Sequence, residues 1–179
     1  KGWRGEMMLT LAKKLFLSGN AYHDLNNVTI LTSNGTTQID HIIVSRYGIF
    51  VIETKNMEGW IFGSEKQSKW VQSLYGKKFP FQNPLHQNYR HIKSLEEFLD
   101  LPAERFHSIV CFVGKTSKLK TEMPDNVING LPFTYIKSKK EIVMSDDQVL
   151  AIVKSIQSRM LPKTLLGLST RETKRKHLA

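Results

Sequence analysis

The sequence predicts one α/β domain in which a mixed β-sheet carries helices on both faces. Apolar residues recur at helical spacing in three segments, residues 6–17, 84–99 and 145–160. The stretch 108–114 is continuously apolar at its centre, which is typical of a strand buried on both faces of a sheet. A chain of 179 residues is long enough to bury roughly two thirds of its unfolded surface in such a domain.

The first half of the chain predicts a helix followed by strands. In residues 6–17 the apolar side chains share one helical face. Asn34-Gly35 is a turn signal of tight hairpins, because this pair accepts positive φ angles. Residues 64–82 mix aromatic residues with lysines and predict no clear element. The predicted strands are Val28–Thr32, Gln38–Ser45, Gly48–Lys55 and Trp60–Phe62.

The second half alternates helices and strands. Asn83 fits an N-cap and Pro84 the first position of a helix, which Pro102 ends. Ser145 to Gln148 has the pattern of a capping box at the start of the last helix. The other predicted segments are a strand over 108–114, a lysine-rich loop over 115–130 and a last strand over Phe133–Ile136.

Charge and cysteine content limit the class of protein. Lys and Arg outnumber Asp and Glu by 26 to 16, a net charge of +10, which favours nucleic acid over a membrane surface as the partner. One cysteine suits a reducing, cytoplasmic compartment. No apolar run approaches the roughly 18 residues of a membrane span, and the chain does not begin with Met, as expected of an excised piece. We expect one domain over residues 1–162 and a basic C-terminal tail over 163–179.

The stretch from Gln38 to Lys55 carries the candidate chemistry. We take its two strands to turn at Arg46–Tyr47 with a two-residue loop. Asp40 then lies opposite Glu53, and Lys55 shares their face of the hairpin. A three-residue turn would instead place the two carboxylates on opposite faces.

Both faces of this hairpin are apolar, which predicts a central position in the sheet with a covering layer on each side. His41 points away from Asp40 and is expected to be a core or supporting residue. One face is expected to carry Ile42, Val44, Ile49 and Val51, and the other Ile39, Ile43, Phe50 and Ile52.

Two carboxylates at one end of a buried sheet repel each other, unless one takes up a proton or a cation lies between them. A Mg²⁺ ion accepts one or two carboxylates and keeps its other positions for water and phosphate oxygens. With Lys55 beside it, such a set has the groups that phosphodiester hydrolysis needs. The alternative is a purely structural set of ion pairs at the strand end.

Asp40, followed on the next strand by Glu53-Thr54-Lys55, resembles the signature of the PD-(D/E)xK nuclease superfamily. Within it, the sequence resembles the NERD (nuclease-related) domain of bacterial and some plant proteins. The resemblance covers residues 2 to about 100, and no comparable motif follows residue 115. The matching segments are Gly5-Glu6, Gln38-Ile-Asp-His-Ile-Ile-Val44, Gly48-Ile-Phe-Val-Ile-Glu-Thr-Lys-Asn56, Gly59-Trp-Ile-Phe-Gly63, Trp70-Val-Gln72 and Asn83-Pro-Leu-His-Gln87.

This resemblance implies a restriction-endonuclease-like core with its elements in the order αβββαβ, which agrees with the order predicted from the residues. It also implies a nuclease that uses Mg²⁺ or Mn²⁺ to hydrolyse DNA. Many members of the superfamily act in pairs to cut both strands, so a homodimer is a further expectation.

The resemblance also implies roles for single residues. Lys55 would orient or activate the attacking water. Four residues after the helix glutamine Gln87, where some branches of the superfamily have a tyrosine, this chain has His91. The implied metal ligands are Asp40, Glu53, the backbone carbonyl of Thr54 and, directly or through water, Glu6. The residues implied to line the site are Gln38, Gln72 and Gln87.

Basic and aromatic residues elsewhere are candidates for nucleic-acid contacts. Solvated lysines and packed aromatic rings are the plainer interpretation. Two other functions stay open at this point: a non-catalytic nucleic-acid-binding module on a nuclease-like scaffold, and a protein-assembly module with its interface over residues 115–140. The candidate phosphate-binding residues are Lys77, Lys78, Lys115, Lys118 and Lys120, and the candidate stacking residues are Trp60, Trp70 and Tyr75.

Overall fold

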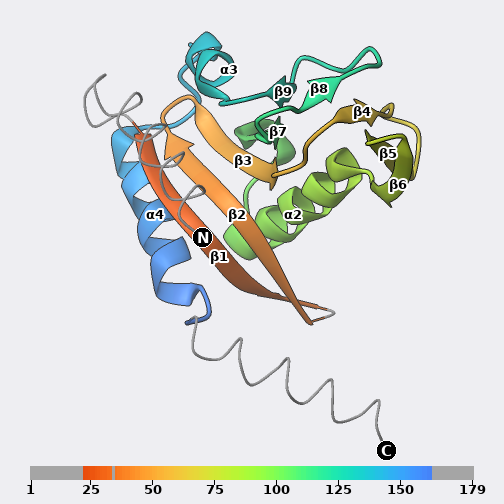
Figure 1. Cartoon of the computed structure of the whole chain (residues 1–179). Helices are drawn as coiled ribbons and strands as arrows, with labels where there is room; N and C mark the ends of the chain where they lie inside the picture. Colours follow the sequence, from red (N-terminus) through yellow and green to blue (C-terminus); the bar gives the residue numbers. More distant parts are fainter. Residues whose placement is uncertain (1–21, 34, 163–179) are drawn as a thin grey trace, which may run out of the picture.

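The computed structural model describes residues 22–33 and 35–162. The predicted helix over 6–17, which includes Glu6, and the basic tail over 163–179 lie outside the described residues. The described part contains two β-sheets with helices packed around them, so the α/β prediction is confirmed (Figure 1). None of its helices has both the length and the apolar character needed to cross a membrane.

Among the described residues, the larger sheet has five strands: β1 (Tyr22–Thr32), β2 (Gly35–Ser45), β3 (Gly48–Lys55), β7 (Phe106–Phe112) and β9 (Val127–Asn129). They lie side by side in this order. β1, β2 and β3 pair antiparallel, whereas β7 pairs parallel with both β3 and β9. The predicted mixed sheet is therefore confirmed.

The β2–β3 hairpin has the predicted register. Ser45 pairs with Gly48, so the turn contains two residues, Arg46 and Tyr47. Gly48 has a φ angle of +128°, and a Cβ at this position would lie 2.7 Å from Nε2 of His107. A residue with a side chain would therefore strain the backbone and displace the imidazole ring.

Helices cover both faces of the larger sheet. On one face lie α2 (Pro84–Leu99) and α4 (Asp146–Arg159), which Figure 1 shows beside the strands in green and blue. On the other face lies α3 (Phe133–Ser138), whose Ile136 packs with Ile43, Phe50 and Ile52. A short 3-10 helix, η1 (Ala103–Arg105), leads into β7. The hairpin is central and covered on both sides, as predicted.

One predicted face assignment is wrong. Alternation predicts Ile39 on the face of Ile43, but the structure packs Ile39 with Ile42 on the opposite face. Asn27, which precedes Val28 on the paired strand β1, has a left-handed backbone with a φ angle of +52°. Such a residue interrupts the two-residue alternation of a strand. Val28 pairs with Ile39, so both strands change faces at this point.

A smaller sheet contains the predicted strand Trp60–Phe62 and two strands from the segment 64–82, for which the sequence predicted no clear element. Among the described residues its order is β6 (Lys77–Gln82), β5 (Lys69–Leu74), β4 (Trp60–Phe62) and β8 (Lys118–Leu119). Figure 1 shows it beyond the C-terminal end of β3 and beside the start of α2. Its inner side is buried, and the ring of Trp70 stacks on Phe112 with centroids 6.0 Å apart. Trp70 is therefore a core residue, contrary to its candidacy for base stacking.

Two further segments differ from the predicted type. Phe133–Ile136, predicted as a strand, lies in the helix α3, where the N–H of Ile136 donates to the carbonyl of Pro132 at 3.0 Å. A short apolar run has the same composition in a strand and in a buried helical turn, so the run alone does not distinguish them. The predicted loop over 115–130 contains the short strands β8 and β9, which extend the two sheets.

Asn83 joins the smaller sheet to α2. Its Oδ1 accepts a hydrogen bond from the N–H of Leu85 at 2.9 Å, which confirms the predicted N-cap. Its Nδ2 donates to the carbonyl oxygens of Ser64, Glu65 and Gln67 at 3.2, 3.1 and 2.7 Å. Because the side chain is fully buried, it holds the β4–β5 loop and the start of α2 together.

The stability of the fold is expected to decrease as the pH falls below 6.5, in part through His107. Burial lowers the pKa of His107 below its ordinary value of 6.5; the hydrogen bond to the carbonyl of Tyr47 opposes this shift, and the charge of Lys139 adds to it. The unfolded chain then binds a proton at a pH where the folded chain does not. The stabilisation is thus present above pH 6.5 and lost as the pH falls toward the folded pKa.

Denaturant unfolding on both sides of pH 6.5 measures this effect. His107→Gln keeps a hydrogen-bond donor and removes the titrating group, so it should flatten the pH dependence. A variant that loses stability with acid as steeply as the wild type would contradict the assignment.

Candidate active site

Glu53 is a buried carboxylate near the end of β3, with only 4% of its surface exposed. Its Oε1 accepts a hydrogen bond from Nζ of Lys55 at 2.7 Å, and its Oε2 lies 3.5 Å from Nε2 of His91. Burial alone raises the pKa of Glu53, but His91 and Lys55 outweigh burial, so the pKa lies below its ordinary value. The carboxylate is therefore ionised at neutral pH.

Lys55 connects this carboxylate to the helix above it. Its Nζ donates to Oε1 of Glu53 and, at 2.9 Å, to Oε1 of Gln87 in the first turn of α2. An ammonium group has three hydrogens. Lys55 can therefore hold both partners and still donate to a third acceptor, such as a water or a phosphate oxygen.

Asp40 lies at the same end of the sheet. The last backbone pair between β2 and β3 is His41 with Ile52. Beyond it, Oδ2 of Asp40 accepts a hydrogen bond from the backbone N–H of Thr54 at 3.1 Å. The carboxylate of Asp40 thus takes the place of a backbone acceptor at the end of the β2–β3 ladder. It lies next to Glu53 and Lys55, which flank Thr54 in the sequence.

A buried amide places α2 over the strands. Asn88 is fully buried, and its Nδ2 donates to the carbonyl oxygens of Val51 and Ile109 at 2.8 and 3.2 Å and to Oγ of Ser108 at 2.9 Å. These acceptors belong to β3 and β7, the parallel pair at the centre of the sheet. The helix is therefore fixed across the strand that carries the charged residues.

His91 is a site residue that the sequence marked only as a departure from a tyrosine. It lies one helical turn after Gln87, on the same face of α2. Its Nδ1 is 2.8 Å from Oγ1 of Thr37, and its Nε2 is buried beside Glu53 with no hydrogen-bond partner among the described residues. When the Thr37 hydroxyl donates to Nδ1, the proton of a neutral imidazole lies on Nε2 and faces the carboxylate. The sequence signal that could have identified His91 is its i, i+4 spacing from Gln87.

The other predicted residues lie elsewhere or outside the described part. Gln38 is exposed and pairs with Thr29 on β1. Gln72 donates from Nε2 to the carbonyl of Glu58 at 2.7 Å, so it supports the loop that follows β3 from the smaller sheet. Glu6 lies in the undescribed N-terminal segment. His41 hydrogen-bonds through Nδ1 to Oδ1 of Asn26.

The donors at this sheet end have the chemistry that a hard divalent cation prefers. Asp40 and Glu53 supply carboxylate oxygens, and Thr54 between Glu53 and Lys55 supplies a carbonyl oxygen. Within residues 22–33 and 35–162, no group of three or more His, Cys, Asp and Glu side chains is spaced to hold a metal ion. The third carboxylate of the predicted set, Glu6, lies outside these ranges.

We expect His91→Leu to lower the free energy of unfolding by about 1–3 kcal/mol, because it removes the buried partner of Thr37 and the polar neighbour of Glu53. His91→Gln places an amide donor in the same region and should lower the free energy of unfolding by less. Denaturant titration of the two variants and the wild type compares them. Equal stability of all three proteins would show that His91 does not hold Thr37 and Glu53.

Comparisons with known proteins show the family of the chain. Residues 1–113 match the family of the nuclease-related domain, NERD. An uncharacterised protein of Bacillus anthracis is 50% identical over 101 residues, which are 55% of this chain and 48% of the relative. The chain thus spans about half the length of the curated relative that it matches. Since the family match covers more than half of the 179 residues, the chain belongs to the nuclease-related domain (NERD) family.

Proposed function

We propose that this domain is a nuclease that uses a divalent metal ion to hydrolyse the phosphodiester bonds of DNA. The observation that carries the proposal is the contact of Lys55 with both Glu53 and Gln87, beside Asp40 at one end of the sheet. Membership of the nuclease-related family supports the same function. The net charge of +10 supports a polyanionic substrate.

Each residue has a role in this proposal. Asp40, Glu53 and the carbonyl of Thr54 would hold Mg²⁺ or Mn²⁺, with Glu6 as a further ligand, directly or through water. When bound, such an ion polarises a phosphate oxygen and acidifies a water molecule. Lys55 would donate a hydrogen bond to the attacking water or to the phosphate.

Gln87 and His91 would keep the charged groups in place. Gln87 accepts from Lys55, which limits the positions that the long ammonium side chain can take. His91 lies against the oxygen of Glu53 that Lys55 does not occupy. Two copies of the chain would provide one such site for each strand of a duplex.

We expect Glu53→Gln and Asp40→Asn each to reduce cleavage by about 100-fold or more, the scale seen when one charged or polar group is removed from a reacting site. The assay is cleavage of supercoiled plasmid and of single-stranded DNA with Mg²⁺ or Mn²⁺, and with EDTA. Nicked and linear products distinguish single-strand from double-strand cleavage.

Glu58→Gln is the matched control, because it removes one exposed carboxylate in the loop directly after β3. It should cleave as the wild type does. If Glu53→Gln and Asp40→Asn cleave as fast as this control, the proposed site is wrong. Cleavage that survives EDTA would exclude the metal-dependent reaction.

One observation favours a non-catalytic nucleic-acid-binding module as the second candidate. In the structure the carboxylates of Glu53 and Asp40 already have partners, Lys55 and the N–H of Thr54, so neither requires a metal ion to be stable. This alternative predicts no cleavage by the wild type, together with DNA binding that neither EDTA nor Asp40→Asn alters.

A further inference from the structure

The smaller sheet has an outer face of basic and aromatic residues. Along its strands, residues alternate between the buried inner side, which holds Ile61 and Trp70, and the outside. We call the outside the basic sheet face. Its basic and aromatic members, all but the half-buried Phe62 exposed, are Trp60, Phe62, Lys69, Lys78, Lys118 and, directly after β8, Lys120.

The strand register brings these residues into one row. Trp60 pairs on one side with Lys118 of β8 and on the other with Ser73 of β5. Ser73 in turn pairs with Lys78 of β6. Paired residues share a face with their Cβ atoms about 4.5–5.5 Å apart, so a lysine stands at each end of a row that has Trp60 in it.

Trp60 is presented as a platform. Its surface is 51% exposed, whereas Trp70 on the opposite side of the same sheet is fully buried. Nζ of Lys120 lies 4.5 Å from the centre of the Trp60 ring. An exposed indole with ammonium groups around it matches a nucleotide, whose base stacks on the ring while its phosphates contact the lysines.

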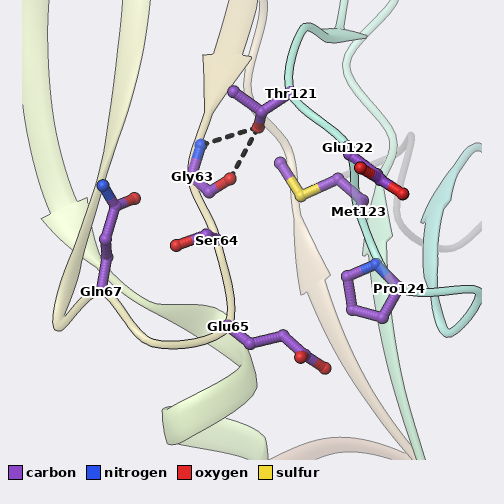
Figure 2. A pocket seen from close by; sticks show the side chains of 8 residues that line it. All are labelled: Gly63, Ser64, Glu65, Gln67, Thr121, Glu122, Met123 and Pro124. Carbon is purple, nitrogen blue, oxygen red and sulfur yellow. Dashed lines mark hydrogen bonds between the residues drawn. The ribbon is translucent and has the colours of Figure 1, made fainter.

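The charge on this face has one sign. The strands β4, β5, β6 and β8 contain no Asp or Glu. Acidic residues occur in the neighbouring loops: Glu58 precedes β4, and Glu65 and Glu122 line a cleft of about 580 Å³ (Figure 2). There the hydroxyl of Thr121 donates to the carbonyl of Gly63 at 2.6 Å and ties the two loops together. The carboxylates of the cleft repel phosphates and so set a boundary to the basic sheet face on that side.

Short links of the chain join the smaller sheet to the candidate active site. Residues 56–59 link Lys55 to Trp60. At the other end of the segment that forms β4, β5 and β6, Asn83 separates β6 from the helix that carries Gln87. A chain of nucleotides held on the face would thus lie on an element whose two ends lead to the charged residues.

We propose that the basic sheet face binds single-stranded nucleic acid, with Trp60 as the platform for an unpaired base and Lys78, Lys118 and Lys120 as phosphate contacts. An unpaired strand fits better than a duplex, because bases stacked inside a duplex do not reach a ring on a flat sheet. This inference deepens the proposed nuclease function by naming how its substrate is held, but binding is measured without cleavage.

The test is fluorescence anisotropy of a labelled single-stranded oligonucleotide in EDTA, with the full chain. Lys118→Gln/Lys120→Gln should weaken binding roughly ten-fold near physiological salt and lower the slope of log K against log salt by about 1.4, the contribution of two phosphate contacts on a single strand. Trp60→Ala should weaken binding about five- to 100-fold, while Trp60→Phe keeps most of the affinity.

The control is Lys140→Gln/Lys154→Gln, which removes the same charge from exposed residues after α3 and on α4, elements packed on the larger sheet. This control should keep the wild-type salt slope. If it weakens binding as much as Lys118→Gln/Lys120→Gln, or if Trp60→Ala binds as tightly as the wild type, the proposal is wrong. Thermal unfolding of each variant identifies any that fails to fold, and in that case Trp60→Leu and the single lysine variants replace it.

Two comparisons complete the experiment. A duplex of the same sequence should bind more weakly than the single strand, and equal or tighter duplex binding would overturn the proposal. The affinities for single-stranded DNA and for RNA of the same sequence show which of the two nucleic acids the face prefers. Binding without any cleavage would overturn the proposed nuclease function but not the proposed binding by the basic sheet face. Cleavage that is unaffected by the Trp60 and Lys118/Lys120 variants would overturn the proposed binding but not the nuclease function.

Discussion

The arrangement of the candidate site depends on the buried amide of Asn88. This side chain donates to carbonyl oxygens of Val51 and Ile109 and to the hydroxyl of Ser108, so one residue of α2 is bound to both β3 and β7. A buried amide donor without an acceptor is unfavourable by about 1–3 kcal/mol, so the loss of these bonds by Asn88 opposes any rotation or sliding of the helix. Gln87 and His91 lie one residue before and three residues after this anchor. Their positions over Glu53 and Lys55 follow from it.

The same helix also connects the two sheets. At its first turn Asn83 holds the β4–β5 loop of the smaller sheet, and further along Asn88 holds the larger one. Between these two anchors lies Gln87, which reaches Lys55. The ion pair of the buried Glu53 and the half-buried Lys55 adds little to folding by itself, because the loss of hydration of the two charges offsets most of their attraction. Its position at the junction of helix and strand is the one that the proposed function requires.

The parts of the structure that depend on local rules could be predicted from the sequence. The β2–β3 register follows from a two-residue turn, and the start of α2 follows from Asn83-Pro84. What the sequence could not supply depends on residues far apart in the chain. The face of Ile39 depends on the backbone of Asn27 in another strand, and the place of Gln72 depends on which sheet β5 joins. The motif identified Glu53, Lys55 and Gln87, but His91 became visible only through its contact with Thr37.

Cys111 has a use that follows from its place in the fold. It is the single cysteine of the chain, its side chain is almost completely buried, and burial raises the pKa of its thiol. In the parallel pair of β7 and β3 it stands beside Thr54, between the two charged residues of the motif. Its side chain packs in the cluster that Ile136 of α3 covers, so a thiol reagent can reach it only when this packing opens. The rate at which the native protein reacts with such a reagent therefore reports local opening at this point, without any engineered label.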